Sequence, residues 1–258
     1  MNTVKIIYGQ RIADPMRSRR RSDTESRTIT YVSEGTASPK SKKDIRREEL
    51  ARTAFDLFIE QGYEKTTMRQ IAFRAKILNG SLYNLFSSKD EIFEHIMVKA
   101  IGIRQSACTS MVEEEKDYLF ALALPFVLEL YACELSPKLT ELFHRAYSNW
   151  DTFNRIVDLD IHWMTQVSEK FGLGLDQEHL RRNTVAIDGC LTKLIDAAFF
   201  TDYNNPQDSA RTLMIIMFTL LNLPLHGIDH LLQRYEELIR GSDVWSRLEI
   251  WPGQYGPE

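Results

Sequence analysis

The chain has 258 residues, of which 43% are hydrophobic and 26% charged, a globular composition with room for one large or two ordinary domains. The net charge of −4 is unevenly spread. Residues 1–90 carry 18 Lys and Arg against 11 Asp and Glu, whereas residues 91–258 carry 14 against 25. This asymmetry indicates that only the N-terminal part would meet a polyanion.

Residues 1–40 are rich in Arg and Ser and show no hydrophobic periodicity, which predicts a disordered or loosely ordered tail. Two interpretations of its basic residues stay open. They are a solvated tail, or an arm that adds non-specific affinity for phosphates.

The next segment predicts a helix over residues 43–61, because apolar residues recur there at three- and four-residue steps. Gly62 ends it. Thr67 and Gln70 then form a capping box that opens a second helix, whose inner face consists of Ile71, Ala72 and Ala75.

A third, very short helix is expected over residues 79–85, with Leu82 and Phe86 pointing inward. It is too short to be stable alone and must be held by its neighbours. Ser88 and Glu91 predict another capping box, which opens a helix over residues 89–105.

The second and third helices, with the short connection between them, have the proportions of a helix-turn-helix. The outer side of the third helix presents small and polar residues, Asn79, Gly80, Ser81, Tyr83 and Asn84. Such a tip fits the major groove of DNA. The alternative is two crossing core helices without a ligand. The capping signals, the polar tip and the local basic charge together favour DNA binding.

At this point the sequence resembles the TetR family of bacterial transcription regulators. The family pattern has an alanine-rich first helix ending in F…G, a Thr-capped helix with IA…A, then G-T-L/F-Y-x-x-F and S/N-K-E. The matching positions are Ala54, Phe58 and Gly62, then Thr67, Ile71, Ala72 and Ala75, then Gly80 to Phe86, and Ser88 to Glu91. The close resemblance covers residues 45–97, and beyond them it is one of architecture.

The resemblance implies roles for individual residues. Phosphate contacts would come from Thr67, Tyr83 and Lys89, and base contacts from Asn79, Ser81 and Asn84. Arg69 would reach a base or the backbone. The start of the first helix would add contacts to phosphates or a minor groove from Lys42, Lys43, Arg46 and Arg47.

Two positions depart from the family pattern. Lys76 stands where Gly is common, so a positive φ in the turn would cost about 1–2 kcal/mol. Leu78 stands where Ser is common and cannot cap the third helix. Asn79 is then expected to take the capping role and to be lost for base contacts.

The remainder predicts further helices, near residues 117–135, 137–148, 150–171, 177–203, 208–222 and 225–240. We therefore expect an all-α protein with a helix-turn-helix domain over residues 41–90 and a larger domain over residues 91–258. Residues 118–135 are apolar enough to span a membrane, but Pro125, Glu129 and Glu134 favour a buried helix and no membrane association.

The resemblance implies a small-molecule cavity in the larger domain, and the mixture of aromatic and polar residues favours an amphipathic ligand. The candidate lining residues are Phe120, Phe126, Tyr131, Phe143, His144, Tyr147, Trp150, His162 and Trp163. The alternative for most of these aromatic residues is an ordinary core.

The resemblance also implies a homodimer built on the helices near 177–203 and 208–222. The candidate interface residues are Leu180, Ile187, Leu191, Leu194, Ile195, Met214, Met217 and Leu221. The second of these helices is apolar nearly all round, so the centre of the domain is the other possible place for it.

No metal, cofactor or catalytic signature is apparent. His226 and His230 have helical spacing but lack a third ligand. The chain has three cysteines, Cys108, Cys133 and Cys190, and they form no CxxC pair. This pattern favours reduced thiols in a cytoplasmic protein.

We therefore expect a non-enzymatic transcription regulator, a repressor that binds an inverted-repeat DNA operator as a dimer and is released by a small amphipathic ligand. The alternative is an architectural DNA-binding protein or activator without a ligand.

Overall fold

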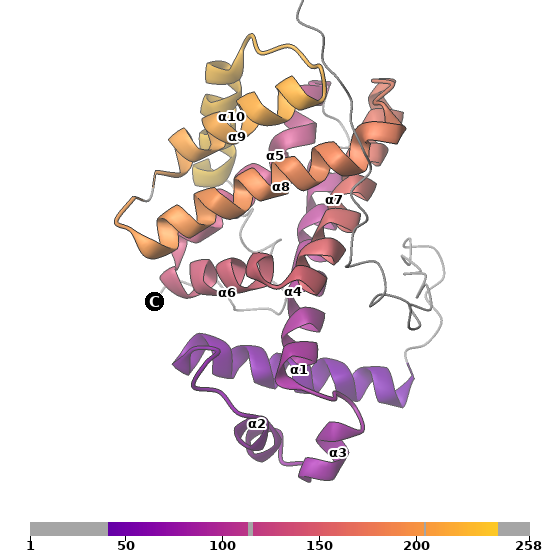
Figure 1. Cartoon of the computed structure of the whole chain (residues 1–258), viewed down its shortest axis with the longest axis vertical. Coiled ribbons are helices and arrows are strands. Elements are labelled where there is room, and N and C mark those ends of the chain that lie inside the picture. Colours follow the sequence, from indigo (N-terminus) through magenta and orange to yellow (C-terminus); the bar gives the residue numbers. More distant parts are fainter. Residues whose placement is uncertain (1–40, 113–115, 204, 242–258) are drawn as a thin grey trace, which may run out of the picture. The chain divides into compact units, whose positions relative to one another are not determined.

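The computed structural model describes residues 41–112, 116–203 and 205–241, which form ten α-helices (Figure 1). Every element in these ranges is a helix, which confirms the all-α fold class. The predicted N-terminal arm, residues 1–40, lies outside the described residues. The helices are α1 (Lys42–Gln61), α2 (Met68–Arg74), α3 (Asn79–Tyr83), α4 (Lys89–Met111), α5 (Tyr118–Leu135), α6 (Pro137–Ser148), α7 (Trp150–Phe171), α8 (Gln177–Phe200), α9 (Pro206–Leu220) and α10 (Ile228–Gly241).

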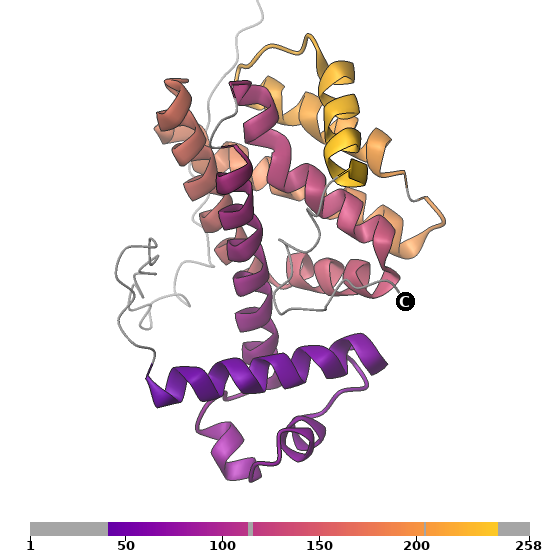
Figure 2. The ribbon, with the colours of Figure 1, turned by 180° about the vertical axis from the view of Figure 1, so that it is seen from behind.

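The first three helices and the first turns of α4 form a small unit, called the head below. Helix α1 packs on α4 and α2, and α2 packs on α3, so that α2 and α3 lie beyond α1 (Figure 2). Their apolar faces meet in one buried cluster that includes Leu50, Phe58, Ile71, Leu82 and Phe86. Packing of these faces, rather than helix propensity, stabilises such short helices.

Helix α4 is shared between the head and the rest of the chain. Its first half packs on α1, where Glu48 contacts both His95 and Lys99. It also packs on α7, where Glu94 pairs with Arg155 at 2.7 Å. The helix extends to Met111, beyond the predicted end near 105, because its later turns remain buried, Cys108 among them.

Helix α5 is the centre of the remaining helices. It contacts α4, α6, α7, α8, α9 and α10. It is long and apolar enough to cross a membrane, but 83% of it is buried within the chain. This burial confirms the prediction of a core helix over residues 118–135.

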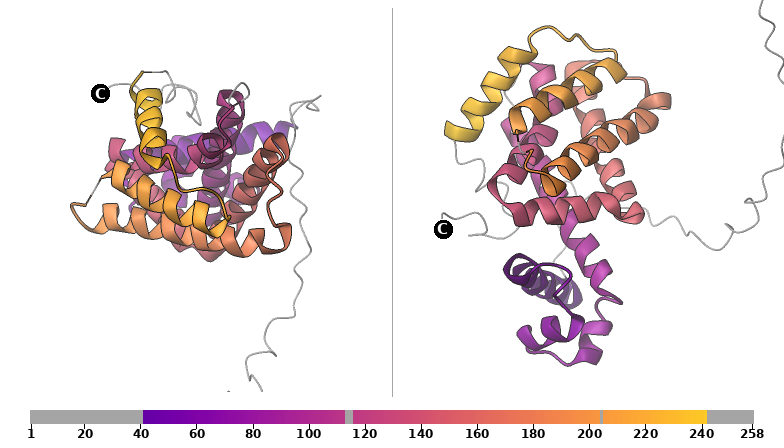
Figure 3. Two further views of the ribbon diagram at one scale, coloured as in Figure 1. Left: turned by 90° about the horizontal axis from the view of Figure 1, so that it is seen from above. Right: turned by 60° about the vertical axis from the view of Figure 1, so that its left-hand side comes forward.

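Helices α8 and α9 pack along each other (Figure 3). The predicted start of α9 near 208 was two residues late. Asn205 caps this helix by accepting a hydrogen bond from the Asp208 amide at 3.1 Å, and Pro206 takes the first helical position. A proline is tolerated at this position because the backbone amide of the first helical residue has no hydrogen-bond partner within the helix.

Candidate nucleic-acid interface

The first of the predicted DNA-contacting residues lie at the start of α2, which is capped by Thr67. The Thr67 hydroxyl accepts from the Gln70 amide at 3.3 Å, and the Gln70 side chain accepts from the Thr67 amide at 2.7 Å. This confirms the predicted capping box. Thr67 and Arg69 are exposed, which leaves both side chains accessible to a ligand.

The turn between α2 and α3 requires a left-handed residue. Lys76 has a φ of 53°, where glycine would be unstrained, and the Ile77 amide donates to the Ala72 carbonyl at 3.0 Å. The predicted cost of Lys76 therefore applies. Leu78 precedes α3 without a side-chain cap, and it is 80% exposed. Asn79 does not replace the cap, contrary to expectation, and its side chain stays exposed.

Helix α3 is held in place by buried apolar side chains and by Arg47 of α1. Leu82 and Phe86 are almost fully buried, as predicted. The Arg47 guanidinium lies 3.9 Å from the centre of the Phe86 ring, donates to the Leu85 carbonyl and pairs with Glu91 at 3.3 Å. Arg47 thus joins α1 to the segment that follows α3 and to α4, which differs from its expected contact with DNA.

The start of α4 is capped in a different way from the prediction. The Ser88 hydroxyl accepts from the Glu91 amide at 3.0 Å, but the Glu91 carboxylate does not return to the Ser88 amide. It accepts instead from the amide of Ser87 at 2.7 Å. The additional pairing with Arg47 draws this carboxylate towards α1, so only half of the capping box forms.

Two of the three predicted base-reading residues lie beside a basic residue of α1. Arg46, Ser81 and Asn84 line one groove of about 390 Å³ between α1 and α3. Gly80 and Tyr83 lie on the exposed part of α3, with Tyr83 55% exposed. Lys43, one turn before Arg47, is exposed as well. The arrangement presents hydrogen-bonding side chains and positive charge to the same side of a short helix.

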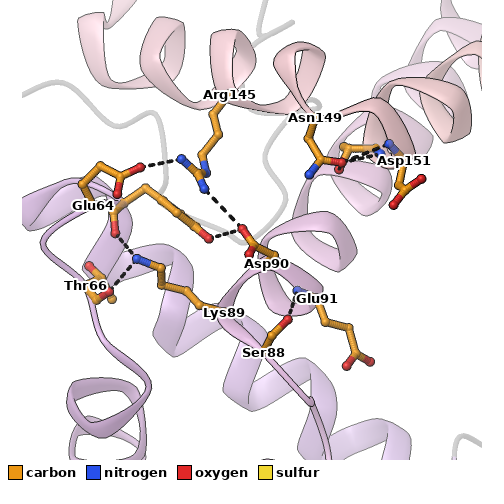
Figure 4. A network of polar contacts seen from close by, with 11 residues as sticks. Glu64, Thr66, Ser88, Lys89, Asp90, Glu91, Arg145, Asn149 and Asp151 are labelled. Carbon is orange, nitrogen blue, oxygen red and sulfur yellow. Dashed lines mark hydrogen bonds and ion pairs between the residues drawn. The ribbon is translucent and has the colours of Figure 1, made fainter.

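Lys89 has internal partners. Its ammonium group donates to the carbonyls of Tyr63 at 2.9 Å and Thr66 at 2.8 Å, and it lies 4.0 Å from the centre of the Tyr63 ring (Figure 4). Burial lowers the pKa of Lys89. Because an ammonium has three donors, one remains for a phosphate. The main role of Lys89 in this structure is to hold the loop before α2 on α4.

A second cation connects this loop to the C-terminal helices. Arg145 of α6 pairs with Glu64 and, at 3.2 Å, with Asp90, while its guanidinium stacks 3.6 Å from the centre of the Tyr63 ring (Figure 4). The Tyr63 hydroxyl donates to Asp90 and, with Arg145, lowers the pKa of that carboxyl. No sequence pattern indicates this network, because its members come from α4, α6 and a loop.

The predicted ligand-pocket residues differ in their burial. Phe120, Phe126, Tyr131, Tyr147 and Trp163 are buried in the core. Phe143 is half-buried and His162 is exposed, as is Trp150 at 66%. His144 bonds Asp196 at 2.7 Å and stacks on Phe199. Trp163 also lines a cleft of about 570 Å³ between α4 and α7.

The predicted interface residues on α8 and α9 are mostly core residues of the single chain. Leu194 is half-buried, whereas the buried members are Leu180, Ile187, Leu191, Ile195, Met214, Met217 and Leu221. The helices' outer faces carry other residues, among them Ala186 and Ile215. The periodicity identified the apolar face correctly but could not tell whether the same chain covers it. His226 and His230 are exposed, and no group of metal-binding side chains occurs among the described residues.

The family described as bacterial regulatory proteins, tetR family, matches residues 50–96. The HTH-type transcriptional repressor KstR2 of Mycolicibacterium smegmatis is 44% identical over 57 residues, which are 22% of this chain and 28% of KstR2. The HTH-type transcriptional regulator HbdR of Aromatoleum sp. is 47% identical over 47 residues, which are 18% of this chain and 20% of HbdR. The chain thus matches less than a third of the length of these curated relatives.

Two solved structures share the fold over most of the chain. RolR in complex with resorcinol superposes with a TM-score of 0.61 at 16% identity, over 75% of this chain and 95% of RolR. FadR of Thermus thermophilus, a TetR family transcriptional repressor in complex with lauroyl-CoA, gives 0.56 at 16% identity, over 67% of this chain and 93% of FadR. The matched family consists of non-enzymatic regulators, as predicted. Residues 50–96 thus carry the sequence pattern of the tetR family of bacterial regulatory proteins, and the solved structures share the fold beyond them.

Proposed function

We propose that the protein is a transcription repressor that reads duplex DNA with α3. The observation that carries this proposal is the groove between α1 and α3, where Arg46, Ser81 and Asn84 converge beside the exposed Tyr83. Side chains near the start of such a helix reach base edges in a major groove. The identity to KstR2, a repressor, supports the same function.

The residues divide into two kinds of contact. Asn84 and Ser81 contact base edges, since an asparagine set bidentate on adenine discriminates by about 1–3 kcal/mol. Tyr83, Thr67, Arg69 and Lys43 contact the phosphate backbone and orient the head without reading sequence. Asn79 and Gly80, at the start of α3, provide further contacts to the DNA major groove.

A homodimer would place one head in each of two major grooves of an inverted-repeat operator. We assign its interface to the outer faces of α8 and α9, where small and apolar residues are exposed or half-exposed. They include Val185, Ala186, Gly189, Cys190 and Ile215. This assignment replaces the buried positions expected from the sequence.

A small amphipathic ligand in the C-terminal helices would release the operator by favouring another orientation of the heads. Its effect is limited to its differential affinity for the two states. Helix α4 and the Arg145 contacts with Glu64 and Asp90 provide the connection. RolR and FadR, which share the fold, are complexed with small molecules. In the alternative, an architectural protein or activator, no small molecule would alter DNA binding.

The test is selection of bound sequences from random duplex DNA with the full chain. We expect an inverted repeat, and Asn84→Ala should blur the preference at one position in each half-site. Tyr83→Phe should weaken binding to all sequences alike. Tyr203→Phe is the matched control, because Tyr203 is exposed to a similar degree, 49%, on the C-terminal part. Selection that enriches no sequence would contradict the proposal.

A further inference from the structure

A cluster of charged side chains is buried where four helices of the C-terminal part meet. Arg104 of α4, Glu129 of α5, Asp160 of α7 and Asp188 of α8 are almost completely inaccessible to solvent. Arg104 pairs with Glu129 and, at 3.5 Å, with Asp160. The Gln105 amide donates to Asp160 at 2.8 Å. We refer to the four charged residues as the carboxylate cluster.

The cluster lacks partners for several of its atoms. Both carboxylate oxygens of Asp188 and one of Asp160 have no hydrogen-bond partner among the described residues. The buried hydroxyl of Tyr147, from α6, has none either. Burial raises the pKa of this hydroxyl, and the charges of Asp160 and Asp188 raise it further. Buried polar atoms are normally satisfied, so these call for a further partner.

The charges of the cluster do not balance. One guanidinium faces three carboxyl groups, and a buried charge without a partner is strongly unfavourable. Burial raises the pKa of Asp188 well above its ordinary value and that of Asp160 to about 6. Burial also raises the pKa of the nearby thiols of Cys108 and Cys133 to about 12, so both stay neutral. A raised pKa favours the protonated carboxyl, so a ligand cation at the cluster would compete with protons for it.

A cleft opens one helical turn from the cluster. The cleft of about 570 Å³ between α4 and α7 is lined in part by Thr109, Trp163 and Val167. Thr109 lies one turn after Gln105 and donates to its carbonyl at 3.0 Å, and Trp163 lies one turn after Asp160. Val112, Trp163 and Val167 offer an apolar wall for an aliphatic body, and the polar part of the lining includes Gln166, Glu169 and Lys170.

We propose that the carboxylate cluster binds the ammonium head of an amphipathic organic amine whose apolar body occupies the cleft between α4 and α7. An ammonium supplies three hydrogen-bond donors and the positive charge that the cluster lacks. An alcohol supplies one donor and no charge, and a carboxylate is repelled. Because the amine shares Asp160 with Arg104, its binding alters a contact of α4, the helix that carries the head. The inference rests on the proposed function by naming the chemical class of its effector.

The test uses the full chain and three probes of equal length, namely hexylamine, hexan-1-ol and hexanoate, titrated by calorimetry in two buffers of different ionisation enthalpy. We expect hexylamine to bind at least about tenfold more tightly than hexan-1-ol, the ratio that one charge-assisted hydrogen bond supplies, and hexanoate not to bind. Binding of the amine should release protons to the buffer. Equal affinities for amine and alcohol, or binding of none of the three, would overturn the proposal.

Variants separate a binding role from a structural one. Asp188→Asn keeps the shape but removes the charge, so the preference for the amine and the proton release should fall while the protein melts at the same or a higher temperature. The control Asp158→Asn, on the exposed side of α7, should change neither. An unchanged amine preference in Asp188→Asn would refute the assignment. DNA binding without any probe is measured separately, so a chain that binds the amine but no DNA would contradict only the proposed function.

Discussion

Replacement of Lys89 by Met tests whether this lysine serves the fold or the nucleic acid. The variant keeps the length of the side chain but removes the hydrogen bonds to the Tyr63 and Thr66 carbonyls. The Tyr63 carbonyl still accepts from the Thr66 amide at 3.1 Å, so only the Thr66 carbonyl loses a strong partner. At about 1.5–3 kcal/mol for a hydrogen bond to a charged group, the free energy of unfolding should fall by roughly 2–3 kcal/mol.

The assay combines denaturant unfolding with the affinity for a selected duplex at several salt concentrations. Lys89→Met should be destabilised while the slope of log affinity against log salt is nearly unchanged. Lys43→Met is the matched control with the opposite outcome, because Lys43 is exposed and each lost phosphate contact lowers the slope by about 0.9. An unchanged stability together with a reduced slope in Lys89→Met would refute our interpretation of the contacts.

Three further changes probe the head. Lys76→Gly should raise the free energy of unfolding by about 0.5–1 kcal/mol, as measured by thermal unfolding. The substitution removes the strain of a left-handed lysine, and the greater freedom of glycine in the unfolded chain offsets part of that gain. Leu78→Ser should add about 1 kcal/mol by capping α3, with Leu78→Ala as the uncapped control. His95 and Lys99 lower the pKa of Glu48 from 4.5 to about 2, so its contribution is complete above pH 4.5 and is lost as the pH falls through 2. Acid unfolding of Glu48→Gln should therefore depend less on pH in that window.

The parts of the fold that could be predicted are those specified by neighbouring residues. The Thr67 capping box and the inward positions of Leu82 and Phe86 follow from spacings of three and four residues, and all occur in the structure. The positive φ at Lys76 agrees with the family pattern, in which Gly is common at this position. The TetR resemblance added the expected order of these elements.

What the sequence could not provide are contacts between distant elements. Arg47 and Lys89 look like free basic residues until Phe86 and the Thr66 carbonyl are placed beside them. Asp188 is polar and was expected at no site, since charged residues are normally exposed. Only the packing of α8 on α7 shows that it is buried.

The most direct test of the central claim is methylation interference on a selected duplex bound by the full chain. Dimethyl sulfate methylates guanine at N7 in the major groove and adenine at N3 in the minor groove. If α3 enters the major groove, N7 methylation within each half-site should block binding, and Asn84→Ala should change the pattern there. Binding that tolerates methylation at every guanine N7 would contradict the account.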